Sequence, residues 1–132
     1  MASIKNAFGN HAINVTEISN LIGDRFYYKR LPNNPTYPCS SYQVIVNNTH
    51  HDIDFSYPRI QVDHFGKNPV IDVSKAFLSE FKRFKGYLNP ADENIPVKQI
   101  EIIDAGSDPP FEENNDLYRI IQEFRIIYQY KE

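Results

Sequence analysis

The stretch YRIIQEFRIIYQY, from Tyr118 to Tyr130, has the strictest alternation in the chain. One set of alternate positions is largely apolar or aromatic: Tyr118, Ile120, Gln122, Phe124, Ile126, Tyr128 and Tyr130. The other set holds most of the charges: Arg119, Ile121, Glu123, Arg125, Ile127 and Gln129. Successive side chains of a strand point to opposite faces, so this stretch predicts a β-strand. At ~3.3 Å per residue it reaches roughly 40 Å, and we expect its end to project towards a neighbouring molecule.

The clearest helix is expected between residues 68 and 88. Asn68 can cap it, and Pro69 suits its first position. At 100° per residue, six apolar side chains fall within an arc of about 80°. They are Val70, Val73, Phe77, Phe81, Phe84 and Leu88, while Lys75, Lys82 and Lys85 point the opposite way. Gly86 weakens the helix and Pro90 prevents its continuation, so it ends near residues 86–90.

The segment from Ser3 to Ile22 predicts two further helical pieces. Gly9 and Asn10 interrupt the first piece, which is followed by a turn. Thr16 is the expected N-cap of the second piece, which ends at Gly23.

Four other segments have the composition or alternation of strands. They are DRFYYKRLP at 24–32, SYQVIV at 41–46, RIQVDHF at 59–65 and VKQIEIID at 97–104. Two polar or acidic segments, 47–58 and 105–116, predict long loops. The sequence therefore predicts an α+β fold. A mostly antiparallel sheet of four to five strands packs against one main helix and a short N-terminal helical segment, in a single domain spanning 1–132.

The composition excludes several classes of protein. A formal net charge of −3 disfavours a protein that mainly grips phosphates, since such proteins have a basic excess. Cys39 is the only cysteine, so the chain can form neither an intrachain disulfide nor a thiolate metal cage. No apolar run is long enough to span a bilayer, and we expect no membrane association. Nine Tyr and nine Phe suit a core or an interface.

Candidate catalytic or metal-binding residues are few. His50, His51, Asp52 and Asp54 lie together, yet metal ligands usually sit two residues apart on a strand or four apart on a helix, which favours a solvated loop. His64 lies on an expected strand as a hydrogen-bonded structural residue. The acidic segment after Asp104 matches no calcium-binding loop. We expect no enzyme activity, cofactor or metal, although a small enzyme that uses His64 with Asp63, or His50 with His51, is the alternative from a different class.

Three segments give the chain a resemblance to a known family. They are LIGDRFYYKRLPNNPTYP at 21–38, RIQVDHFGKN at 59–68 and the closing DLYRIIQEFRIIYQYKE at 116–132. With the elements in this order, the chain resembles the tail-terminator family of siphophages, also called tail-completion or tail-to-head joining proteins. The resemblance covers nearly the whole chain. The strand around YPCSSYQV is less apolar than the family pattern, and the first loop is polar.

The resemblance implies a structural role in a virion. Members of the family have an α+β fold and form a hexameric ring on the head-proximal end of the tail tube. Such a ring stops tube polymerisation, binds the tube protein, and presents a surface to the head-completion or neck protein. It is assembled in the host cytoplasm. DNA passes through it without sequence-specific binding, which a mildly acidic protein allows. Another connector component, such as a head-closure ring, is the alternative within the same class.

We expect subunit or partner contacts at the loops Asn47 to Tyr57 and Ala105 to Asp116 and at the aromatic end of the closing strand. Aromatic side chains on polar loops and long strands can supply packing and edge pairing between copies. The candidate contact residues are His50, His51, Asp52, Phe55, Tyr57, Pro110, Phe111, Tyr128 and Tyr130.

Overall fold

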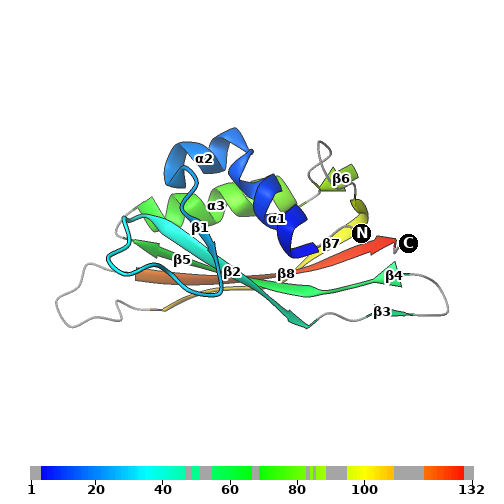
Figure 1. The fold of residues 1–132 in the computed structure, drawn as a ribbon. Coiled ribbons are helices and arrows are strands. Elements are labelled where there is room, and N and C mark those ends of the chain that lie inside the picture. The colour runs from blue at the N-terminus through cyan, green and yellow to red at the C-terminus, as the bar shows by residue number, and fades with distance from the viewer. Residues whose placement is uncertain are drawn as a thin grey trace.

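The computed structural model describes residues 4–46, 49–50, 55–66, 69–82, 84, 86–88, 95–108 and 118–129. These residues form three helices and eight strands. The helices are α1 (Ile4–Ile13), α2 (Thr16–Ile22) and α3 (Pro69–Phe81). The strands are β1 (Phe26–Tyr28), β2 (Cys39–Val46), β3 (Thr49–His50), β4 (Phe55–Ser56), β5 (Arg59–Gly66), β6 (Gly86–Leu88), β7 (Ile95–Asp108) and β8 (Tyr118–Gln129). Figure 1 shows the helices in one layer over one face of the sheet, which confirms the α+β class.

The sheet is built from two long antiparallel pairs and a short edge strand. β2 pairs with β5 and β7 pairs with β8, while β8 also pairs with β5 and so joins the two halves. β3 and β4 continue β2 and β5 beyond their ends, and β4 pairs with the end of β8. Among the described strands the only parallel pairing is that of β1 with β2. The predicted mostly antiparallel sheet is confirmed.

β8 lies in the centre of the sheet and alternates as its sequence predicts. Gln122, Phe124 and Ile126 are buried against the helix layer, whereas Glu123 and Arg125 are half-buried on the other face. Because β5 and β7 flank β8 on both sides, its backbone groups are satisfied within the sheet along most of its length. Its side chains can therefore differ strongly between the two faces without loss of pairing.

Aromatic rings fill the space between helices and sheet. The ring of Phe8 on α1 is the centre of this packing, with four other ring centroids within 6.3 Å: those of Phe26, Tyr42, Phe81 and Phe124. Phe77 and Phe81 on α3 are fully buried in the same cluster. Each such ring contributes roughly 1.5–3 kcal/mol through burial, so this layer supplies much of the stability. Many of the aromatic side chains therefore lie in the core between the helices and the sheet.

Gly9 lets α1 approach the sheet closely. A Cβ atom at this position would lie 2.2 Å from the hydroxyl oxygen of Tyr42, which is far too close. That hydroxyl donates a hydrogen bond to the backbone oxygen of Lys5 at 3.1 Å, and burial raises the pKa of Tyr42 to about 12. The predicted interruption at Gly9 is wrong, because α1 runs through it to Ile13. The glycine is needed for packing rather than for a turn.

The predicted start of α2 and end of α3 both need correction. Val15 is the N-cap of α2 and makes no side-chain capping bond, so Thr16 is the first helical residue instead. Gly23 does end α2, with φ of +60° and its N–H bonded to the oxygen of Ser19 at 2.8 Å. α3 begins at Pro69 as predicted but ends at Phe81, and Asn68 lies outside the described residues. Leu88 is buried as expected, yet it belongs to β6, where pairing with β7 directs it to the core.

Both predicted loops contain strand. In the first, β3 and β4 pair with each other and extend the sheet. In the second, β7 continues through Ala105 to Asp108, each step opposite a residue of β8. A polar composition predicts loops poorly here, because a long neighbouring strand supplies hydrogen-bond partners to whatever sequence lies beside it.

Candidate interaction surfaces

The strand pairing brings together predicted contact residues from two distant parts of the sequence. His50 lies opposite Phe55 in the β3–β4 pair, and Phe55 and Ser56 lie opposite Gln129 and Tyr128 of β8. The chain thus gathers the first predicted loop and the end of the closing strand at one end of the sheet (Figure 1). His51, Asp52 and Tyr130 lie outside the described residues.

The end of β8 does not project freely as far as it is described. Tyr128 pairs with Ser56 of β4 on one side and with Val97 of β7 on the other. Its side chain is half-buried and packs against the hydrophobic core. Up to Tyr128 the strand therefore does not extend past its own sheet, because β4 and β7 of the same chain cover both of its edges there.

The second predicted loop belongs to the opposite end of the sheet. Pro110 and Phe111 lie outside the described residues, but the last register pair of β7 and β8 is Asp108 with Arg119. β8 has 12 residues, so its two ends, each next to one of the predicted contact regions, are separated by roughly 40 Å.

The sheet face away from the helices holds a row of ion pairs. Arg119 Nη2 lies 2.7 Å from Asp63 Oδ2, and Arg59 Nη2 donates a hydrogen bond to Glu123 Oε2. A looser pair joins Arg125 to Glu101 at 3.8 Å. These side chains come from β5, β7 and β8, whose alternation directs them to the same face.

This face carries both signs of charge in close alternation. Gln61 donates to the second carboxylate oxygen of Asp63 at 2.8 Å, and Arg119 also lies over the ring of Phe65 at 6.0 Å. Each of the three arginines is thus held near a carboxylate and is less available to a phosphate group. Such a surface favours oriented contacts with a protein over adhesion to nucleic acid.

Two strands have a backbone edge that the described residues leave open. β7 pairs with β8 from Val97 to Asp108, whereas β6 covers its other side only from Ile95 to Val97. On the far side of the sheet, β1 covers only Ser40 to Tyr42 of β2. Ile45, farther along β2, is 42% exposed. Open edges and an exposed apolar side chain are features through which a further strand can pair.

A chain of hydrogen bonds crosses the core beneath α3. Ser40 Oγ lies 2.7 Å from His64 Nδ1, and His64 Nε2 lies 2.6 Å from Gln122 Oε1. The amide of Gln122 donates to the backbone oxygen of Ser74 at 3.0 Å. Because that last bond fixes which atom of Gln122 accepts, His64 donates through Nε2 and accepts from Ser40 through Nδ1. The chain links β2, β5, β8 and α3.

Ser40 and His64 are as close together as a nucleophile and its general base, but unlike such a pair they are not exposed to solvent. Ser40 and His64 are both fully buried, so no substrate reaches them in this arrangement. Burial lowers the pKa of His64 to about 4, against smaller opposing effects of Gln122 and Asp63. A neutral imidazole that satisfies its neighbours matches the predicted structural role of His64.

Cys39 and the other candidate metal ligands give no reactive arrangement within the described part of the chain. Burial raises the pKa of Cys39 to about 11, with Arg25 acting weakly in the opposite sense, so the thiol stays protonated at neutral pH. His11 pairs with Glu80 at 2.7 Å. No group of three histidine, cysteine or acidic residues among the described positions could hold a metal ion.

The sequence pattern does not predict the ion pairs on the sheet face away from the helices. Arg59, Asp63 and Glu123 each fall on the polar side of an alternating segment, so the sequence places them on one face. It does not give the register between the strands, which decides whether opposite or like charges meet.

Comparisons with known proteins support the fold. Neither protein-family models nor curated protein sequences give a match. Among solved structures, the chain is similar to a chain from the virion of a native gene transfer agent particle, with a TM-score of 0.64 and 12% identity. The likeness covers 96% of this chain and 95% of the other, so the two share one architecture almost from end to end. No helix in the described residues is both long and apolar enough to cross a membrane.

Proposed function

We propose that the chain is a non-enzymatic structural protein of a phage virion, located at the head-proximal end of a long tail. Six copies form a ring that caps the tail tube, stops its polymerisation and joins the tail to the neck of the head. The observation that carries this proposal is the end-to-end likeness to a chain of a gene transfer agent virion. The resemblance of segments 21–38, 59–68 and 116–132 to tail terminators makes it specific.

The surfaces of the chain support assembly. A ring needs two different contact regions on each copy, since a head-to-tail interface repeats until the rotation closes. The open edges of β7 and β2 lie on opposite sides of the sheet and fit this requirement. The paired charges of the face away from the helices add orientation to such contacts.

The two ends of the sheet provide separate regions for different partners. At one end we assign contacts to His50, His51, Asp52, Phe55, Tyr57, Tyr128 and Tyr130, and at the other to Pro110 and Phe111. With roughly 40 Å between them, one end can bind the tail tube protein while the other reaches the neck protein or an adjacent subunit. DNA passes through the ring without sequence-specific contacts, which the net charge of −3 favours.

Removal of the gene from the phage that carries it tests this function. Loss of a terminator leaves tube growth unchecked, so electron microscopy should show overlong or ragged tails that are not attached to heads. Filled heads that leak DNA beside tails of normal length would contradict the proposal and identify a head-closure protein instead. A complementing copy of the wild-type chain is the control.

A loop variant separates the contact role from the fold. Replacement of residues 51–54 by the shorter loop Asn-Gly leaves β3 and β4 a two-residue turn, so circular dichroism and the melting temperature should remain close to those of the wild type. The variant should fail to restore joined, infectious particles. Full complementation by this variant would contradict the contacts assigned to the first loop.

A further inference from the structure

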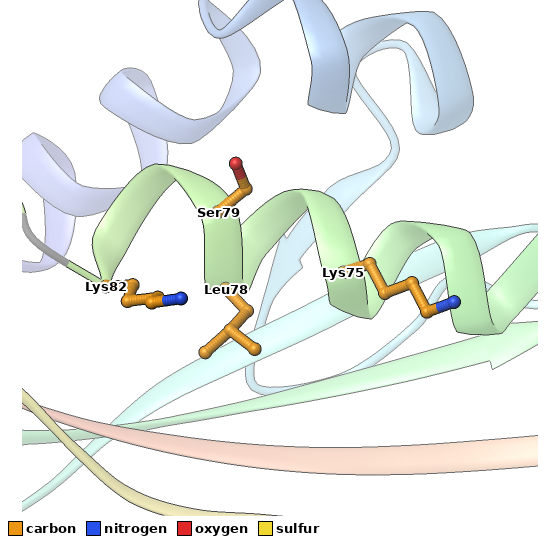
Figure 2. A pocket seen from close by; sticks show the side chains of 4 residues that line it. All are labelled: Lys75, Leu78, Ser79 and Lys82. Atoms are coloured by element: carbon orange, nitrogen blue, oxygen red, sulfur yellow. The ribbon is translucent and has the colours of Figure 1, made fainter.

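α3 carries a groove along one side. The groove has a volume of about 410 Å³ and is lined by Lys75, Leu78, Ser79 and Lys82. Figure 2 shows Leu78 pointing from α3 towards the sheet, with the two lysines on either side of it along the helix. Lys75 and Lys82 are exposed and Leu78 is half-buried. The groove therefore has an apolar centre between two positive charges, which stand about 10 Å apart along the helix.

α2 carries a stripe of the opposite charge with a similar spacing. Glu17 lies in the first turn of α2, and Asp24 follows Gly23, the residue that ends this helix. Both acidic residues are exposed, and seven residues of helix separate two positions by roughly 10 Å. Leu21 lies between them, one turn after Glu17, and is half-buried. The stripe therefore has an apolar centre between two negative charges.

The charges of the groove and of the stripe are not used within the described part of the chain. The ion pairs found there join α1 to α3 and link the long strands to one another. Arg25, which follows Asp24, is half-buried and donates instead to the backbone oxygens of Leu21 and Pro38. Two lysines on α3 and two carboxylates on α2 can therefore pair with a second molecule.

α2 of the same copy does not occupy the groove. Figure 2 shows the other two helices, in pale blue, on the side of α3 away from the sheet, whereas Leu78 points towards the sheet. Ile18 and Ile22 of α2 are fully buried in the core and so fix how this helix is rotated. At 100° per residue their mean direction lies about 120° from that of Glu17. The acidic stripe therefore faces away from its own core and towards solvent.

We propose that the groove on α3 binds α2 of a second copy of the chain. Leu21 of that copy packs against Leu78, and the two carboxylates beside Leu21 pair with the two lysines. Complementary charge at matching spacing identifies a second copy as the occupant, because every copy presents both surfaces. The apolar centres match in the same way, and helices packed side by side in this manner lie 8–10 Å apart.

This contact is of the kind that a ring requires. It joins two different regions of the chain, so it is head-to-tail and repeats until the rotation closes. The inference deepens the proposed function, on which it rests, by naming one lateral contact between neighbouring subunits.

Charge reversal in the full-length chain tests the contact. Sedimentation velocity over a concentration series is measured for the wild type, for Lys75→Glu/Lys82→Glu and for Glu17→Lys/Asp24→Lys. Each double variant should weaken association roughly tenfold or more, because like charges then meet across the contact. An equimolar mixture of the two variants should recover association, since the reversed groove of one then meets the reversed α2 of the other.

Matched controls keep the charges at the same positions. Lys75→Arg/Lys82→Arg and Glu17→Asp/Asp24→Glu should associate as the wild type does. Circular dichroism checks that each variant is folded, and a variant that unfolds is replaced by Lys82→Glu or Asp24→Lys alone.

The outcomes separate this contact from the proposed function. If the wild type associates and the reversed variants do so equally well, the groove contact is wrong while the ring proposal stands. Loss of association in both variants without recovery in the mixture shows that the two surfaces do not meet, and overturns the contact. A wild type that stays monomeric throughout the series also overturns it, while tail length after removal of the gene still decides the proposed function. If the lysine variant loses only binding to added duplex DNA, the groove is a phosphate site and the contact is wrong.

Discussion

The two faces of the sheet differ sharply although the same strands build them. Along β8, Phe124 and Ile126 are fully buried beneath the helices, while the intervening Arg125 forms an ion pair on the other face. The helix-covered face combines aromatic packing with one complete hydrogen-bond chain. The other face has paired charges and partly exposed side chains.

The two faces therefore contribute to different properties, one to the stability of the fold and the other to contacts with other molecules. Burial of rings contributes kilocalories for each residue, whereas an ion pair that water can reach contributes little. The covered face therefore determines whether the chain folds. The face with paired charges and the open strand edges are free to determine what the folded chain contacts.

The largest effect should come from removal of a ring on the covered face. Phe124→Ala should lower the free energy of unfolding by about 3–5 kcal/mol, because it leaves a cavity at a fully buried position. Ile126→Ala on the covered face and Ile121→Ala on the other face remove the same side chain from β8, and Ile121→Ala should cost clearly less, since Ile121 is half-buried and Ile126 is fully buried. Urea unfolding measures all three variants, and equal losses for the two isoleucine variants would contradict the difference between the faces.

Acid should lower the free energy of unfolding, because His64 is buried in its neutral form on the covered face. Its pKa is about 4 when folded and near 6.5 when unfolded, so the unfolded chain takes up the proton first as pH falls. Stability from this group is complete above pH 6.5 and is lost between about pH 6.5 and 4, by up to roughly 3 kcal/mol.

His64→Gln provides the comparison for that acid effect. The variant lacks this titration, while His11, His50 and His51 are present in both proteins and cancel in the difference. The fall in unfolding free energy from pH 7 to 4.5 should be smaller in His64→Gln than in the wild type. The same fall in both proteins would show that His64 is not a buried neutral group.

Close packing of α1 on the sheet is tested at Gly9. Gly9→Ala should destabilise the chain by about 1–3 kcal/mol, since its Cβ would meet the hydroxyl of Tyr42 at 2.2 Å. In a Tyr42→Phe background the same substitution should cost less, because the hydroxyl is gone. A gain in stability for Gly9→Ala, as expected at an open helical position, would contradict this packing.

The sequence predicted the elements whose own side chains determine their state. β5, β8 and the start and core of α3 have strict periodicity, and each lies close to where it was expected. β3, β4, β6 and the far part of β7 were missed. Their residues are polar or few, and they are strands because a longer neighbour pairs with them.

The arrangement of the candidate contact residues is harder to predict from the sequence than the fold. Residues of the first loop and Tyr128 are both on the list of predicted contacts, but only the pairing of β4 with β8 shows that they share one end of the sheet. The groove beside α3 that Lys75, Leu78, Ser79 and Lys82 line is also not predictable, because the helical period places Lys75 and Lys82 on the side opposite the apolar arc and gives no neighbour for them.

The smallest effect is expected on the face with paired charges. A double-mutant cycle of Arg119→Ala and Asp63→Ala should give a coupling of at most about 1 kcal/mol, because Arg119 is about one-third exposed. The same variants should alter association of the chain more than its unfolding. A coupling above 3 kcal/mol would mean that this face also determines the fold.

The most direct test of the proposed role is electron microscopy of the purified chain mixed with its tail tube protein during polymerisation. The proposal predicts rings at one end of each tube and shorter tubes as more of the chain is added. Tubes of unchanged length with bare ends, at concentrations where the chain is folded, would contradict it.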